Sequence, residues 1–366
     1  MLDALIPFAY LLASVLFVVG LKLMSSPRTA VRGNLVGAAG MLVAIVATCL
    51  DPSVAAYTAI ILGLVVGAII GVVLAVRVQM TAMPQMVALL NGLGGAASTL
   101  VAWSDLLRGD SHPVDTLIAV GATGLIGAVT FWGSLVAYAK LEELKGFRNP
   151  VSLPGQQAIN LLLVVACVIL TWMLAASHST ATQVSCYLAI VVLSSALGVF
   201  LVNPIGGADM PVVISLMNSY SGLAGAATGF VIDNNVLIIS GSLVGASGII
   251  LTQIMCKAMN RSLFNVLFGV MGGGSSGGPT DEIYANVRST SADDIAMILE
   301  GAQRVVIVPG YGLAVAQAQH AVRDLSKLLE AKGATVEYAI HPVAGRMPGH
   351  MNVLLAEADI SYDKLK

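Results

Sequence analysis

The first ~260 residues consist of long apolar stretches, and these constrain the fold more than any other feature of the chain. A helix needs about 20 mainly apolar residues to cross the hydrocarbon of a bilayer. Nine stretches approach that length: 4–24, 34–50, 55–76, 84–107, 114–139, 157–176, 183–202, 211–230 and 235–259. Turn signals such as Asp51-Pro52 and Asn203-Pro204 separate most of them. The sequence therefore predicts a polytopic α-helical membrane protein with about nine transmembrane helices.

The composition agrees with this class. Charged residues make up 10% of the chain, against about 25% in soluble domains. A net charge of −2 predicts no nucleic-acid partner. The four cysteines lie in or beside apolar stretches without metal-ligand spacing, so we interpret them as small buried residues and predict no metal site.

Basic residues beside the apolar stretches collect on one side of the membrane. An odd number of spans places the two ends of the chain on opposite sides. Only Arg108 falls on the side of the N-terminus. Because loops rich in Lys and Arg stay in the cytoplasm, we expect the N-terminus outside and the C-terminal tail in the cytoplasm. The nine cations on the side of the tail are Lys22, Arg28, Arg32, Arg77, Lys140, Lys145, Arg148, Lys257 and Arg261.

After residue 262 the chain becomes polar. We divide it into a transmembrane domain (1–262), a flexible linker (263–290) that contains a glycine-rich run, and a cytoplasmic domain (291–366). The last part predicts, in order, a helix at 291–300, a strand at 304–308, a helix at 313–332, a strand at 334–340 and a helix near 351–358. This order favours a Rossmann-like parallel sheet. Two strands cannot bury the faces of such a sheet, so we expect a partial domain and a chain that is truncated after Lys366.

A glycine-rich turn joins the first predicted strand to a helix. In dinucleotide-binding folds the first glycine allows a tight turn and the second lets the backbone approach the pyrophosphate, at a helix N-terminus. Gly310 and Gly312 fit these two positions, and Val315 stands where a third small residue is usual. The alternative is an ordinary turn without a ligand. No acid ends the second strand, and Arg346 follows it, which favours NADP over NAD unless Arg346 is a simple surface residue.

A few polar residues within or beside the apolar stretches are candidates for function. Asn91 shares a helical face with Gly95 and Ser98, and Asn218 shares one with small residues of the eighth stretch. Such faces either allow close helix packing or line a polar route through the bundle. Asp209, just before the eighth stretch, either complements the helix N-terminus or handles protons next to the tail. No histidine falls within a stretch, so we expect no histidine relay inside the membrane.

Five blocks of sequence resemble the β subunits of proton-translocating NAD(P) transhydrogenases. They are 206–213, 218–222, 255–262, 309–319 and 341–358, and the last two are long and specific. The resemblance covers essentially the whole chain. It implies that a separate α subunit holds NAD(H) and that the tail of this chain holds NADP(H). Hydride would pass directly between the two nicotinamides while a proton crosses a bacterial inner membrane inward, in a dimer of α–β units embedded in lipid.

The resemblance also implies roles for particular residues. For NADP binding they are Gly310, Tyr311, Gly312, Val315, Arg346 and Gly349, and for proton transfer and coupling they are Asn91, Asp209, Asn218 and Arg261. Arg261 has the alternative role of anchoring the ninth stretch at the interface. Asn91 stands where some members of the family carry a histidine. The family's later NADP-binding elements would lie beyond Lys366, so we expect the chain alone to hold NADP weakly and to be inactive.

Two other hypotheses remain open. A membrane transporter or channel regulated by a cytoplasmic nucleotide-binding domain would also join a helical bundle to a dinucleotide-binding turn. It predicts solute or ion flux without hydride chemistry, although the sequence shows no carbonyl selectivity filter and no broken inverted repeats. The third hypothesis is a nonproductive fragment, in which a membrane block carries an unfolded tail.

Overall fold

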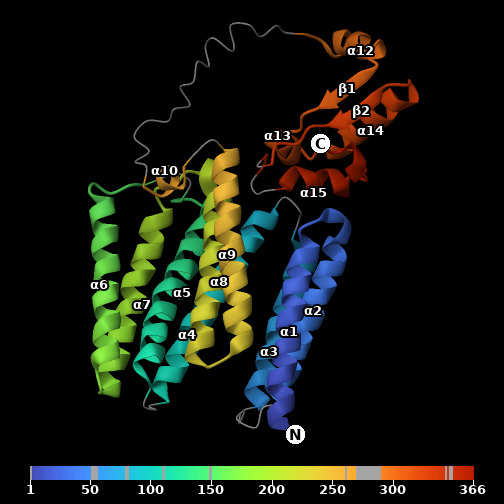
Figure 1. Cartoon of the computed structure of the whole chain (residues 1–366). Coiled ribbons are helices and arrows are strands. Elements are labelled where there is room, and N and C mark those ends of the chain that lie inside the picture. Colours follow the sequence, from blue (N-terminus) through green and yellow to red (C-terminus); the bar gives the residue numbers. More distant parts are fainter. Residues whose placement is uncertain are drawn as a thin grey trace.

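A computed structural model describes residues 2–50, 57–78, 82–108, 112–147, 151–259, 262–268, 290–342, 344–345 and 349–366. A bundle of long helices carries a small α/β domain at one end (Figure 1). All nine predicted apolar stretches form helices, of 21 to 28 residues. They are α1 (Leu2–Met24), α2 (Pro27–Cys49), α3 (Tyr57–Arg77), α4 (Met83–Leu107), α5 (Val114–Leu141), α6 (Gln156–Ala176), α7 (Thr180–Val202), α8 (Met210–Val231) and α9 (Asn235–Ala258).

Eight of these helices, within the described residues, are long and apolar enough to span a membrane. The exception is α8, whose sequence is diluted by polar and small residues. It has the length of a span, 22 residues, but fifteen of them are buried against other helices. A helix that neighbouring helices cover does not need the apolar surface that lipid demands. The ninth expected span is therefore α8, which differs in composition from the other eight helices.

The first two helices form a tight hairpin whose turn is shorter than expected. The second apolar stretch was predicted to begin at residue 34, but α2 begins at Pro27, so Arg28 and Arg32 lie on the helix and not in a loop. Proline suits the first turn of a helix, where its missing N–H costs nothing. A Cβ on Gly33 would lie 2.7 Å from the Gly20 backbone oxygen. The missing side chain therefore lets α1 and α2 touch backbone to backbone.

The best-packed part of the bundle lies around α8. Its residues form an apolar core with α4, α5 and α9, in which Met210, Met217 and Met255 are at most 1% exposed. Glycines bring α8 and α9 together, because a Cβ on Gly222 would lie 2.5 Å from the Gly245 backbone nitrogen. Close approach through small residues is the usual basis of helix packing in membranes.

The segment after α9 corrects one expectation. Residues 263–290 were predicted to be a flexible linker, but Leu263–Phe268 forms helix α10. Val266 of α10 is buried in the same apolar core as α8 and α9, which explains why this short helix forms. Residues 269–289, with the glycine-rich run, lie outside the described residues.

The tail follows the predicted order of elements: α12 (Ala292–Glu300), β1 (Arg304–Ile307), α13 (Tyr311–Val315), α14 (Gln319–Ala331), β2 (Thr335–Tyr338), α15 (His350–Glu357) and the short η3 (Tyr362–Lys364). Ser291 and Asp294 form the expected capping box of α12. The strands β1 and β2 are parallel, with Arg304 opposite Thr335. Leu365 bridges to Tyr338 on the other edge of β2, also in parallel. Two four-residue strands alone do not establish a Rossmann-like domain.

The helix expected at 313–332 is interrupted. It is divided into α13 and α14 by Gln317, whose φ of 49° ends the first helix. The Ala318 N–H then donates to the Leu313 oxygen at 3.1 Å, which satisfies a carbonyl at the end of α13. Apolar side chains on α13 and α15 nevertheless pack together, with Ala314, Met351 and Leu354 at most 1% exposed.

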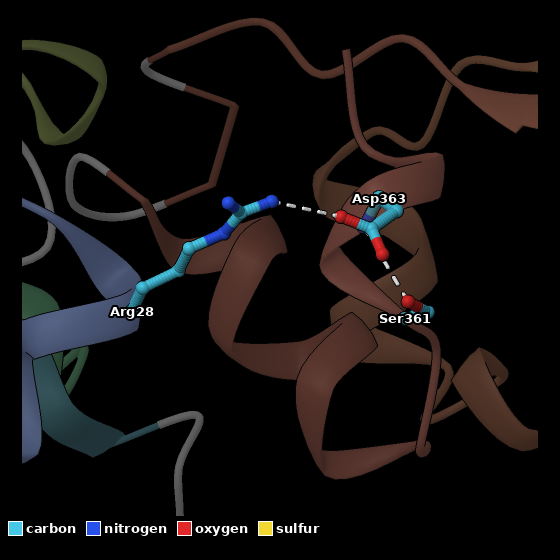
Figure 2. A network of polar contacts seen from close by, with 3 residues as sticks. All are labelled: Arg28, Ser361 and Asp363. Atoms are coloured by element: carbon cyan, nitrogen blue, oxygen red, sulfur yellow. Dashed lines mark hydrogen bonds and ion pairs between the residues drawn. The ribbon is translucent and has the colours of Figure 1, made fainter.

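One ion pair links the tail to the bundle. A guanidinium nitrogen of Arg28, on α2, lies 3.1 Å from a carboxylate oxygen of Asp363 in η3 (Figure 2). The Asp363 N–H also contacts the Ser361 hydroxyl at 3.4 Å. Both charged side chains are largely exposed, at 84% and 79%. Water therefore weakens this contact, which marks where the tail meets the bundle without holding it firmly.

Candidate functional site

Asn91 lies inside the bundle, on the face of α4 that packs against α8. Its side chain belongs to a residue only 6% exposed, and its amide Nδ2 donates a hydrogen bond to the Ile214 backbone oxygen at 3.3 Å. In a helix that carbonyl is also the acceptor for the N–H of Asn218, four residues further on. The structure thus brings Asn91 and Asn218 to within one helical turn of each other. Asn218 is half-buried, and its amide has no hydrogen bond among the described residues.

Small residues beside Asn91 let α5 approach closely. A Cβ on Gly95 would lie 2.6 Å from the Gly127 oxygen, and one on Gly92 would lie 3.2 Å from the Ser134 Cβ. Ser134 is 1% exposed, and its hydroxyl has no hydrogen bond within the described part of the chain. The sequence did not single out Ser134, although a hydroxyl inside an apolar stretch was the available signal. The small residues therefore pack the helices and also leave polar side chains between them.

Asp209 lies at the end of the bundle that carries the tail. It ends the short helix η2 (Gly207–Asp209), is the N-cap residue of α8 and is 3% exposed. Its side chain makes no capping bond to α8, so it complements that helix by position alone. The carboxylate also lies within electrostatic range of Cys256 near the end of α9. Arg261, three residues after α9, lies outside the described residues.

A buried lysine supports the segment that carries Asp209. Lys140, in the last turn of α5, is 7% exposed and donates hydrogen bonds to the backbone oxygens of Asn203 and Ile205, the latter at 2.7 Å. Its sequence position predicted one more cation beside an apolar stretch. The structure instead shows an ammonium group that bridges carbonyls after the end of α7, where helical acceptors are left without partners. Lys140 thereby ties α5 to the connection between α7 and α8.

The glycine-rich turn of the tail is open to solvent. Gly310 has φ −111° and ψ 176°, an extended conformation that any residue can adopt, so the turn itself does not require glycine there. No atom lies within 4 Å of a Cβ built on Gly310 or on Gly312. The missing side chains therefore leave room over the backbone, as a bound phosphate group would need. Val315 ends the five-residue α13 and is 66% exposed.

A second glycine loop lies against this turn. Gly345 has φ +111°, and a Cβ there would lie 2.4 Å from His350 Nδ1, so both backbone and space require glycine. Gly349 has φ +73° and precedes α15. His350 is 2% exposed, and its ring centre lies 6.3 Å from that of Tyr311. The structure therefore brings Tyr311 and Gly349 together and adds His350, while Arg346 lies outside the described residues.

The one acid of β2 has another partner. Glu337 Oε2 accepts a hydrogen bond from Arg304 Nε of β1 at 3.0 Å. This bond and the charge of Arg304 hold the pKa of Glu337 below its usual range. The residues after the strand, from Ala339 to Pro342, contain no acid. A carboxylate for a ribose hydroxyl is therefore missing where NAD-binding folds carry one.

A cavity of about 390 Å³ lies between the glycine-rich turn and the bundle. Tyr311 and Val315 line it from the tail, and Gln85 and Glu142 line it from the start of α4 and the end of α5. Gln85 Nε2 and Glu142 Oε2 lie 3.4 Å apart, so they join the two helix ends. Asn91 lies about 9 Å further along α4 from Gln85 and about a third of a turn away around the helix.

The described part of the chain combines eight helices that are long and apolar enough to span a membrane with a glycine-rich turn between a strand and a helix at one end of the bundle. A family model described as NAD(P) transhydrogenase beta subunit matches residues 6–366. The chain is 48% identical over 369 residues to NAD(P) transhydrogenase subunit beta of Rhodospirillum rubrum, which covers 98% of this chain and 78% of the relative. The same values apply to the protein of that name from strain ATCC 11170. The chain belongs to the NAD(P) transhydrogenase beta-subunit family.

Proposed function

We propose that this chain binds NADP(H) in its tail and couples hydride transfer between NADH and NADP⁺ to inward proton movement through its helical bundle. The observation that carries the proposal is the cavity between the two parts. It lies between the glycine-rich turn and the start of α4, the helix on which Asn91 contacts α8. A change at the nucleotide site thus has a short route to the polar residues of the bundle. The family membership supports this function over a nucleotide-regulated transporter.

The open turn suits a dinucleotide phosphate. Gly310 and Gly312 would hold the pyrophosphate, with Tyr311 between them, Val315 beside it and Gly349 on the facing loop. Lack of an acid after β2 favours NADP, whose extra phosphate an acid would repel, with Arg346 as its proposed partner. NADP(H) when bound supplies or accepts the hydride, so the protein contributes orientation and exclusion of water.

The proton route is proposed to follow the buried face between α4 and α8. Asn91 and Asn218 are amides, which orient a proton path but do not titrate. Asp209 is the nearby acid, buried at the start of α8. Because Lys140 fixes the connection that carries it, a shift of α5 would move Asp209 with it. Coupling then requires two arrangements of the bundle that nucleotide binding favours unequally.

The assembly follows from the family. The proposed partner is a transhydrogenase α subunit that holds NAD(H), with two α–β units in the complex. The proposed location is the bacterial inner membrane, with α8 as the ninth span, the N-terminus outside and the tail in the cytoplasm. The proposed domains are a transmembrane part at 1–262 and a nucleotide-binding part from 291 onward. The chain without an α subunit is proposed to be inactive.

The test is a reconstitution. The chain is expressed with and without an α subunit and placed in proteoliposomes. We expect hydride exchange between NADPH and an NAD analogue, accompanied by proton movement, only with the α subunit present. Hydride transfer without proton movement would contradict coupling. Solute or ion flux without hydride transfer would favour the transporter hypothesis.

Asp209→Asn tests the proton route within the same vesicles. The amide keeps the shape of the side chain and removes its charge. We expect proton movement to fall at least about tenfold, in the lower range for loss of an acid–base group. Melting temperature should change little, which separates the effect from unfolding. Full coupled activity in this variant would remove Asp209 from the mechanism.

A further inference from the structure

A buried acid–histidine pair closes the end of the bundle that faces away from the tail. His112 Nε2, before α5, lies 3.6 Å from Asp105 Oδ2 in the last turn of α4. The two side chains are only 12% and 13% exposed. Neither of these atoms has a hydrogen bond within the described residues. His112 therefore lies in the loop between α4 and α5 and is packed against a helix end.

The pair lies on the same helical face as Asn91. Polar residues recur on one side of α4 at Asn91, Ser98 and Asp105, at intervals of seven residues. Seven residues are close to two helical turns, so the three share one face. Asn91 and Ser98 are each at most 8% exposed. We call this face, from Asn91 to Asp105, the α4 seam.

The α4 seam covers most of the depth of a membrane. Asp105 lies fourteen residues after Asn91 along α4. At 1.5 Å per residue that is about 21 Å, against about 30 Å for the hydrocarbon core. The polar face therefore runs from the amide that contacts α8 to the acid–histidine pair.

We propose that Asp105 and His112 form a proton-binding site at the outer end of the α4 seam. This inference rests on the proposed function, since it assigns the group that exchanges protons with the outer solution. Imidazole is the side chain that normally exchanges protons near neutral pH. A proton from the outer solution binds the Nε2 lone pair, and the carboxylate of Asp105 stabilises the resulting positive charge. Asp105 is thus a positioning residue for the imidazole.

The other charged groups that the structure describes at this end of the bundle are exposed. Arg108, Asp115 and Asp233, from α4, α5 and the α8–α9 turn, are exposed in the structure as described. His178, before α7, is also exposed. The side chains packed below the pair are apolar or aromatic, among them Leu106, Leu117 and Tyr187.

The pair could instead serve only to hold α4 against the start of α5. That role would need only a hydrogen bond, whereas proton exchange needs groups that titrate. The double variant D105N/H112Q keeps two polar groups of similar size and removes titration. H178Q is the matched control, because it removes another histidine from the same side of the bundle. The exchange D105H/H112D keeps the titrating couple with its members reversed.

The measurement is gradient-driven NADPH formation by the complete α–β complex in proteoliposomes. The pH is varied only on the side away from the nucleotides, between about 5 and 8, where imidazole titrates. We expect D105N/H112Q to lower the rate at least about tenfold and to abolish its dependence on outer pH. H178Q should keep both, and D105H/H112D should regain the pH dependence. Melting temperatures verify that each variant folds.

Two results distinguish a failure of this inference from a failure of the proposed function. Wild-type vesicles that transfer hydride without moving protons would contradict the proposed function itself. Wild-type proton movement that persists in D105N/H112Q, with unchanged rate and outer-pH dependence, would overturn this inference alone. A folded D105H/H112D variant without any outer-pH dependence would also count against it.

Discussion

Among the nine long helices, α3 and α8 differ most in how much of the helix is buried within the chain. The most apolar of the eight candidate spans is α3, and it has no buried residue within the chain. The helix that fails the same composition test, α8, has fifteen of its 22 residues buried. Apolar composition therefore reports contact with lipid or a partner subunit and not depth within the protein. In a membrane, the polar and small residues collect where helix packs against helix.

The glycines of the two helices make the same point. Gly63, Gly67 and Gly71 of α3 follow one another at four-residue spacing, and no atom lies within 4 Å of a Cβ built on them. Gly222 of α8 has the same sequence context of small residues, but a Cβ there would collide with α9. A glycine motif alone does not distinguish these cases. The comparison predicts that burial decides how much each residue matters.

The largest expected effect comes from Gly222→Leu. A Cβ at this position would lie 2.5 Å from one backbone atom and 2.9 Å from another, so α8 and α9 must separate. We expect loss of the folded protein, seen as aggregation in size-exclusion chromatography of detergent extracts. The matched variant Gly67→Leu should elute as the wild type does, because its added side chain meets open space.

A smaller effect is expected from Ser219→Ala. Its hydroxyl donates to the Gly245 oxygen at 2.6 Å and is fully buried between α8 and α9. Such bonds contribute about 0.6 kcal/mol in membrane proteins, which a chemical unfolding titration in mild detergent resolves. Thr58→Ala on the exposed surface of α3 is the control and should cost less. Equal losses in the two variants would contradict the comparison.

The tail extends the comparison to an aqueous ion pair. Arg304 lowers the pKa of Glu337, so the native carboxylate is favoured relative to the unfolded chain. This contribution is present above the ordinary carboxyl pKa of about 4.3 and is lost as pH falls through the lowered native value. Hydrogen exchange of the β1 and β2 amides should therefore accelerate slightly in acid, beyond the intrinsic effect of pH. Glu337→Gln should remove that additional change, and its persistence would assign it to another group.

The smallest effect is expected from Arg28→Ala. Its ion pair with Asp363 is exposed on both sides, so its loss should cost at most about 0.5 kcal/mol. The wild type in high salt should behave like the variant, because salt screens the same contact. Thermal melting at two salt concentrations measures both. A large, salt-dependent shift would show that the tail depends on this contact.

The sequence was sufficient for the helices because each long apolar run has one solution in lipid. Even α8 was found, since its run lies between clear turn signals. The start of α2 was missed because Arg28 and Arg32 reduce the apolar signal, although proline allows a helix to begin before them. The break at Gln317 was missed because glutamine gives no local sign of a positive φ.

The site was predictable only in part for a different reason. Asn91 and Asn218 were found because an amide is rare in an apolar run, and the fold then brought them together. The contacts of Lys140 and His112 were not predicted, because the partners of Lys140 are distant in sequence and that of His112 lies at a helix end. Partners of that kind exist only after the helices pack, so one stretch of sequence does not reveal them.

The bond from Lys140 has a consequence for how the protein is made. Its acceptor, Asn203, lies 63 residues later in the chain, so the ribosome completes α5 well before that partner exists. Until the hairpin of α6 and α7 has been inserted, the ammonium group must remain among the lipid headgroups at the membrane surface. The ammonium group can leave the headgroup region for its buried position only once α7 is in place. One buried cation would thus impose an order on insertion, with α5 settling after a hairpin that is synthesised later.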